Sequence, residues 1–145
     1  MRSRALLTGA AVAAAVAFGA TAANTGAAAV TKVPRDCRHE TFKPKGILIA
    51  CGDGSLFMTG MHWSSWGRKA ANGVGTAHLN DCNPFCAAGH FHKYKARIKL
   101  SSAHFCRAEK VTQFRRLRLT WVNGTPPNTP SKISDPVACP SAMTP

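Results

Sequence analysis

The chain is short of acidic residues. Its 145 residues include 6 Asp and Glu against 19 Lys and Arg, so the formal net charge at pH 7 is +13. Such a charge attracts anionic partners, among them nucleic acid, anionic lipid headgroups, acidic polysaccharides and teichoic-acid-like polymers. It is equally consistent with a protein whose charge only keeps it soluble. Charge alone therefore narrows the class of partner without naming one.

The sequence also lacks the short motifs of common enzymes. It contains no G-x-S-x-G, H-E-x-x-H, P-loop or dinucleotide-binding fingerprint. A two-carboxylate hydrolase can be drawn with Asp53 and Asp81. Both residues have simpler roles, because Asp53 lies in a D-G turn and Asp81 can bond its own backbone. We therefore predict a protein that is not an enzyme and needs no cofactor, with a small secreted hydrolase as an alternative.

Motifs for metal and for specific nucleic-acid binding are missing as well. No helix-turn-helix, RNP-like aromatic motif or finger is present, so we expect no sequence-specific nucleic-acid recognition. No C-x2-C pair occurs, which argues against a zinc-thiolate site. His90 and His92 could gather a metal with other histidines, but an i, i+2 pair is common by chance, and we predict no metal site.

The one long apolar run lies at the N-terminus. Met1–Arg4 carries two arginines, Ala5–Ala20 is apolar, and Ala20-Thr21-Ala22 offers small residues for cleavage. This is the pattern of a secretory signal peptide, which we predict over residues 1–22 as a helical segment, with Ala29 as a second candidate cleavage site. An uncleaved anchor is the alternative, although the run is short for a membrane span. We therefore predict a secreted, extracellular protein with no transmembrane segment after cleavage.

The cysteines all follow this leader. An even number of cysteines in an exported chain indicates disulfides, and six allow 15 pairings. Loss of residues 1–22 leaves 17 basic and 6 acidic residues, a net charge of +11. We expect a flexible arm over 23–36, then a single disulfide-bonded β-domain over 37–145 with an irregular C-terminal tail, as a monomer. The disulfide cysteines are Cys37, Cys51, Cys82, Cys86, Cys106 and Cys139.

Short apolar runs between turn residues, and runs with apolar residues at every second position, predict strands. They lie at 46–51, 56–63, 74–79, 91–101 and 111–122, with turn residues between them and a weakly signalled helix at 68–72. In the second run we expect Phe57, Thr59, Met61 and Trp63 on one face. This pattern predicts an all-β fold, a small disulfide-stabilised antiparallel sandwich or barrel of about 5–7 strands.

Cations alternate with apolar residues in two of these strands. Ala96, Ile98 and Leu100 share one face of the 91–101 strand, and the other face carries a row of cations, as does a second strand. If the two strands pair, the rows merge into a patch that binds polyanions with strong salt dependence. The alternative is a solvated face whose lysines oppose aggregation. The candidate binding residues are Lys93, Lys95, Arg97, Lys99, Arg116 and Arg118.

Aromatic residues cluster near the middle of the sequence. Trp63 and Trp66, with Phe57 and Phe91, could form a platform on which sugar rings stack. Core packing is the favoured interpretation, because a small domain with few aromatics tends to bury them.

Four motifs resemble a group of small, uncharacterised secreted actinobacterial proteins. They are A-C-G-D-G at 50–54, W-x-x-W-G at 63–67, N-D-C-N-P-F-C-A-A-G at 80–89 and F-H-K-Y at 91–94. The resemblance covers roughly residues 37–122 and implies a compartment and a fold style, but no activity. Because relatives often lack the last two cysteines, it implies a Cys106–Cys139 disulfide. It favours Cys37–Cys51 with Cys82–Cys86 for the rest, unless strand 46–51 lies beside the 82–86 loop, where a cross-pairing would replace both.

Together these patterns predict a secreted binding or structural protein. Its basic face would engage anionic polymers or the cell-envelope surface. An extracellular protein-interaction or inhibitor-like module that uses the cysteine loop at 80–90 is the main alternative.

Overall fold

The computed structural model describes residues 30–143. They form a six-stranded antiparallel sheet whose strands follow one another in chain order, and a separate two-stranded sheet. The elements are β1 (Val33–Pro34), β2 (Glu40–Thr41), β3 (Ile47–Leu48), β4 (Leu56–Trp66), β5 (Ala70–Asn80), β6 (Phe91–Cys106), β7 (Val111–Trp121), β8 (Lys132–Pro136) and the 3-10 helix η1 (Pro140–Met143). The predicted all-β class is confirmed. The predicted signal peptide over 1–22, with its helix, lies outside the described residues, as do residues 23–29.

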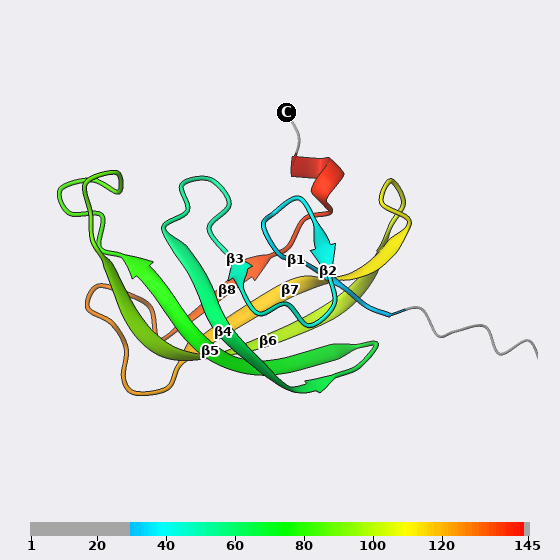
Figure 1. Cartoon of the computed structure of the whole chain (residues 1–145), viewed down its shortest axis with the longest axis horizontal. Coiled ribbons are helices and arrows are strands. Elements are labelled where there is room, and N and C mark those ends of the chain that lie inside the picture. The colour runs from blue at the N-terminus through cyan, green and yellow to red at the C-terminus, as the bar shows by residue number, and fades with distance from the viewer. Residues whose placement is uncertain (1–29, 144–145) are drawn as a thin grey trace, which may run out of the picture.

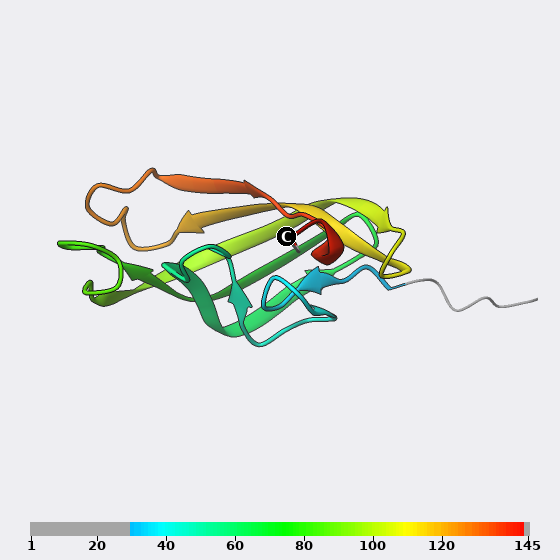
Figure 2. The same cartoon turned by 90° about the horizontal axis from the view of Figure 1, so that it is seen from above.

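The large sheet is curled into a trough. Figure 1 shows β1, β2 and η1 on its concave side, and Figure 2 shows the strands of the sheet side by side beneath these covering segments. We call the concave side the inner face and the opposite side the outer face. The predicted sandwich or barrel therefore takes the form of one curled sheet, closed by short segments where a sandwich would have a second sheet.

The alternation predicted for the two long central strands is confirmed. Ala96, Ile98 and Leu100 of β6 are fully buried, and Leu119 of β7 lies opposite Ile98 in the register. Successive residues of a strand point to opposite faces, so the residues between these apolar positions must lie on the outer face. Burial of the apolar positions on the inner face thus forces the alternating cations onto the outer face.

The prediction for β4 is wrong beyond Gly60. This glycine has a φ of 59°, and the pairing of β4 with β5 shifts register between Thr59 and His62. The extra residue of such a bulge reverses the alternation. Met61 is therefore buried on the inner face, whereas Phe57 lies on the outer face.

The predicted helix at 68–72 is absent from the described structure. β4 and β5 are joined there by a tight turn in which the amide of Gly67 donates to the carbonyl of Ala70, at 2.8 Å. The weak helical propensity of these residues is overridden by the pairing of β4 with β5, which continues to Trp66 and Ala71.

The C-terminal tail is more regular than predicted. Residues 132–136 form β8, the last strand of the sheet, with Ile133 opposite Leu119 of β7. Proline-rich flanks hide this strand in the sequence, and Pro136 is tolerated because β8 is an edge strand.

The last residues of the predicted flexible arm belong to the fold. Thr31 and Val33 are buried, at 2% and 1% exposure. The amide of Lys32 donates to Thr112, and the amide of Phe114 donates back to Lys32, so the arm lies along β7. Within the predicted arm, Thr31, Val33 and Pro34 are therefore buried against the sheet, whereas Val30 stays exposed.

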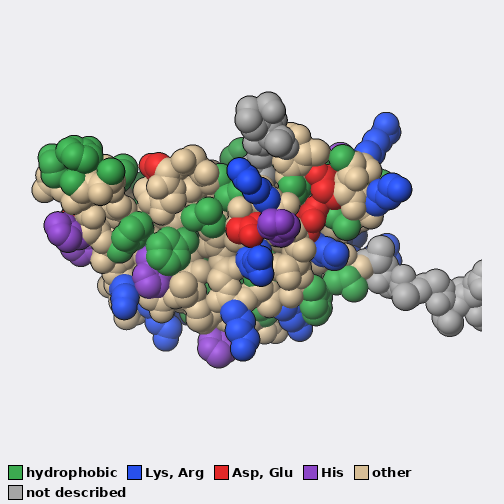
Figure 3. Space-filling model, turned by 45° about the horizontal axis from the view of Figure 1, so that its top comes forward, with side chains coloured by type: hydrophobic (Ala, Val, Ile, Leu, Met, Phe, Trp, Pro, Cys, Tyr) green, Lys and Arg blue, Asp and Glu red, His purple; other side chains and the backbone are tan. Residues whose placement is uncertain are grey.

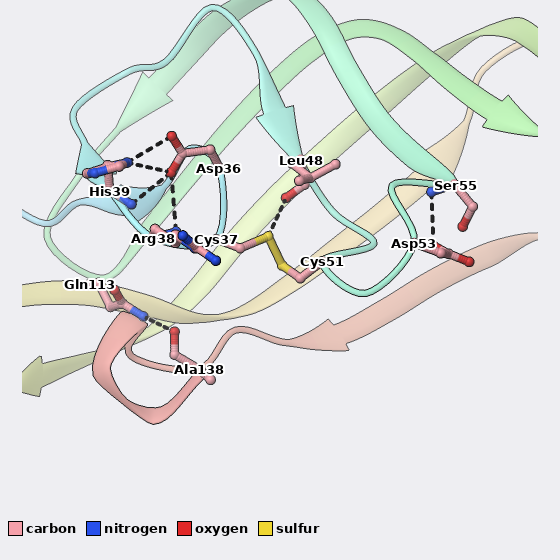
Figure 4. Close-up of a disulfide and its surroundings, with 10 residues drawn as sticks. All are labelled: Asp36, Cys37, Arg38, His39, Leu48, Cys51, Asp53, Ser55, Gln113 and Ala138. Atoms are coloured by element: carbon pink, nitrogen blue, oxygen red, sulfur yellow. Dashed lines mark hydrogen bonds and ion pairs between the residues drawn. A yellow bond between two sulfur atoms is a disulfide. The ribbon is translucent and has the colours of Figure 1, made fainter. Parts of the chain in front are cut away.

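Three disulfides fasten the covering segments and one loop. They join Cys37 to Cys51, Cys82 to Cys86 and Cys106 to Cys139, which are the pairs that the resemblance implied. Figure 4 shows the first of them between the segment after β1 and the loop after β3. Disulfides of this kind add stability that the small core of such a domain does not supply alone.

Each tryptophan ties a neighbouring segment to the sheet, two of them the N-terminal covering segments and one the connection between β7 and β8. The indole N–H groups of Trp63, Trp66 and Trp121 donate to the carbonyls of Pro44, Thr31 and Pro130, at 2.8–2.9 Å. Tryptophan rings that bury their apolar body need a partner for this N–H. The tryptophans are therefore scaffold residues, which confirms the packing interpretation for Trp63 and Trp66.

Glycines on β5 make room for the side chains and backbone of β4, and Gly75 provides a test. A Cβ there would lie 2.6 Å from Sδ of Met61 and 2.8 Å from the carbonyl oxygen of Thr59. We expect Gly75→Ala to lower the free energy of unfolding by about 1–3 kcal/mol, measured by urea denaturation. Gly52→Ala is the matched control, since nothing lies within 4 Å of its added Cβ. Equal stability of the two variants would contradict this packing.

Candidate polyanion-binding face

The two predicted rows of cations share the outer face. β6 and β7 pair directly, with Lys99 opposite Arg118 and Ser101 opposite Arg116. Lys93, Lys95 and Arg97 continue the row along β6, and all six predicted residues are exposed. Neighbouring cations on one strand face are about 7 Å apart. The two rows of cations therefore merge into one patch, as the sequence analysis required for polyanion binding.

β8 adds a cation that sequence reasoning missed. Lys132 lies opposite Thr120 of β7, which in turn lies opposite Arg97 of β6. It is exposed and therefore extends the patch across a third strand. Only the strand assignment of the tail could have revealed it. The outer cation face is hereafter the set Lys93, Lys95, Arg97, Lys99, Arg116, Arg118 and Lys132.

A depression of about 420 Å³ lies in the middle of this face. Its cations are Arg97, Lys99 and Arg118, and its neutral polar side chains are Ser64, Asn72 and Thr120. The Asn72 amide donates to Ser65 at 2.9 Å, and the Ser64 hydroxyl donates to the carbonyl of Asn72 at 3.1 Å. The depression thus combines positive charge with ordered hydrogen-bonding groups.

The carboxylates are held away from this face. Asp36, Asp53, Asp81 and Glu109 each accept hydrogen bonds within turns or between loops, and Asp135 shares the face of Leu117, which is the inner one. Figure 3, which looks toward the side with the covering segments, shows carboxylates gathered there. Among residues 30–143, every salt bridge involves Asp36 or Asp81, and none reaches the outer cation face.

Like charges on this face destabilise one another. Lys99 and Arg118 are direct cross-strand neighbours, and like charges in that position cost stability. No carboxylate among the described residues offsets the repulsion. A bound anion would relieve it, so the arrangement is chemically suited to holding anions.

An aromatic cluster lies at one end of the outer face. The Phe57 ring stacks on His78, with centroids 4.5 Å apart, and meets the Phe91 ring edge to face at 5.3 Å. His78 lies opposite Lys93, and its ring nitrogen Nε2 is 2.8 Å from the hydroxyl of Thr59. Burial, with a smaller effect of Lys93, lowers the pKa of His78 below its ordinary value. The aromatic platform considered from sequence is thus divided: its phenylalanines lie outside and its tryptophans inside.

The histidines considered as metal ligands take part in separate contacts. His92 is 3.1 Å from Asp81, whereas His78 belongs to the aromatic cluster. In the described part of the chain, Cys106, Glu109 and Cys139 come close enough to share an ion. Their two sulfurs form a disulfide, which is not a thiolate ligand.

The loop between β5 and β6 is rigid and apolar at its tip. Asn80 binds the backbone of Cys82 and Cys86 with its side chain, and the disulfide closes the same turn. Phe85 projects from it with 61% exposure. Asp53 and Asp81 each hold their own turn, so their contacts give no support to the paired carboxylates of a hydrolase.

Asp81 makes the loop sensitive to strong acid. The backbone N–H of His90, then the side chain of His92 and the N–H of Asn83, lower its pKa from 3.8 to about 2. Its contribution to loop stability is therefore complete above pH 3.8 and is lost as the pH falls through about 2. We expect an NMR titration of the His90 amide to show this midpoint, and Asp81→Asn to abolish it. A midpoint near 4 would contradict the contacts described.

No family model, curated protein or solved structure matches this chain. The resemblance to secreted actinobacterial proteins therefore stays a prediction. Within residues 30–143, no helix has the length and apolar character needed to cross a bilayer. The functional proposal consequently depends on the geometry of the outer face.

Proposed function

We propose that this protein binds anionic polymers of the cell envelope through its outer cation face. The observation that carries the proposal is the register of β6 and β7, which sets Lys99 opposite Arg118 and joins two rows of cations into one surface. A linear polyanion laid along β6 would meet a cation at about every 7 Å.

The electrostatics of the described chain support this proposal. The cations of the outer cation face have no carboxylate partner in a salt bridge among the described residues. Three of these cations line the depression in the middle of the face. Binding of a polyanion releases counterions, so affinity should fall steeply as salt rises. Three disulfides are compatible with an extracellular protein, where anionic envelope polymers would be accessible.

The loop at 80–90 supports a second candidate function, a protein-interaction or inhibitor-like module. The observation that favours this function is Phe85, whose ring is exposed on a loop that a disulfide and Asn80 hold in place. A rigid aromatic residue binds a partner pocket at little entropic cost. This use would depend on Phe85 and not on the outer cation face.

Charge reversal tests the proposed function. We expect Lys95→Glu with Arg97→Glu to elute from immobilised heparin at markedly lower salt than the wild type. The slope of log K against log salt should fall by about 2, because two cationic contacts are lost. Both side chains are exposed strand residues, so folding should survive, which circular dichroism will verify.

The matched control carries the same charge change elsewhere. Lys45→Glu with Arg107→Glu alters two exposed residues outside the outer cation face. This variant should elute from heparin at a salt concentration close to that of the wild type. Equal losses in both double variants would show that net charge alone governs binding and would refute the proposed site. Phe85→Ala should not change elution, which separates the second candidate from the first.

A further inference from the structure

We propose that the polyanion recognised by the outer cation face is an acidic polysaccharide, with a sugar ring packed on Phe91 and its acid groups paired with the cations beside it. This inference rests on the proposed function and names the class of its ligand. It is carried by the position of the aromatic cluster, by the neutral polar groups among the cations and by the charge of the face.

Phe91 is an exposed ring in line with the cations. It is the first residue of β6, and its 47% exposure is high for a phenylalanine. Alternation puts it on the same face of the strand as Lys93 and Lys95. A ligand that lies along β6 would therefore meet an aromatic surface and then a run of positive charges.

The orientation of this ring is supported by its neighbours. Phe57 touches it edge to face and is itself stacked on His78, at an interplanar angle of 8°. His78 is tied to Thr59 by the contact of 2.8 Å. These contacts limit the motion of the Phe91 ring before a ligand arrives, which lowers the entropic cost of binding.

Neutral hydrogen-bonding groups are interleaved with the cations. Thr76 lies between Thr59 and Lys95 in the register, while Ser64, Asn72 and Thr120 line the depression. A polyphosphate chain offers such a surface charged acceptor oxygens, but neither hydroxyl groups nor an apolar face. A polysaccharide also offers hydroxyl groups, which need hydroxyl and amide partners, and an apolar C–H face, which favours an exposed aromatic ring.

A single-stranded nucleic acid fits the surface less well. Proteins that bind it without sequence preference stack successive bases on several aromatic side chains. Phe91 is the one large hydrophobic residue of β6, β7 or β8 within 30–143 that is both highly exposed and in line with the cation row, whereas Phe105 lies at the far end of β6. One stacking position with a mixed polar surface favours sugar rings over a series of bases.

The test compares three polyanions with the intact, disulfide-bonded protein. Isothermal titration calorimetry at fixed ionic strength would measure binding of polygalacturonate, polyphosphate and oligodeoxythymidylate. We expect Phe91→Ala to weaken binding of polygalacturonate by about fivefold and of polyphosphate by less than about twofold. Phe91→Tyr should preserve binding, because it keeps the ring. Phe105→Ala, which removes a ring with 53% exposure from the far end of β6, is the matched control and should change neither affinity.

Several results would overturn the inference. They are unchanged polygalacturonate affinity in Phe91→Ala, an equal loss for polyphosphate, or tighter binding of oligodeoxythymidylate than of polygalacturonate. If reversal of Lys95 and Arg97 weakens all polymers while Phe91→Ala weakens none, the proposed function stands and this inference fails. If the wild type binds none of the three, both fail.

Discussion

The structure depends on the burial of one face of β6. Ala96, Ile98 and Leu100 are completely enclosed between the sheet and its covering segments, and β6 is paired with a long neighbour on each side. A slip of one residue in the strand register would bury Lys95, Arg97 and Lys99 in place of these side chains. Burial of unpaired cations is strongly unfavourable in free energy. The register is therefore strongly determined. The same constraint that builds the core places a row of cations in solvent.

The elements with a strict alternation were predictable from sequence, and those without it were not. β6 and β7 follow a period of two over a long run, so their faces were assigned correctly. The bulge at Gly60 could not be inferred, because a glycine within a strand is compatible with several geometries. β8 was missed because its five residues lie among prolines, and with it Lys132 was missed. The depression depends on cross-strand register, which no single sequence supplies.

The carboxylates lie away from the outer cation face, although other cations lie beside them. The six carboxylates of the chain serve turns, loops and the side that bears the covering segments, while the outer face of β6, β7 and β8 keeps its cations unpaired. Asp36 illustrates the first role, since the His39 side chain and the backbone N–H groups of His39 and Arg38 hold its pKa well below the usual range (Figure 4). The unpaired cations of the outer face would orient the molecule toward a negatively charged surface before contact.

The three indole hydrogen bonds have a spectroscopic consequence. Trp63, Trp66 and Trp121 are all the tryptophans of the chain; the first two bond the N-terminal covering segments and the third bonds the connection between β7 and β8. Intrinsic fluorescence of this protein therefore reports on whether the trough is closed. A polymer that occupies the outer cation face contacts none of these indoles directly, so a change in emission on binding would indicate movement of the segments that they hold.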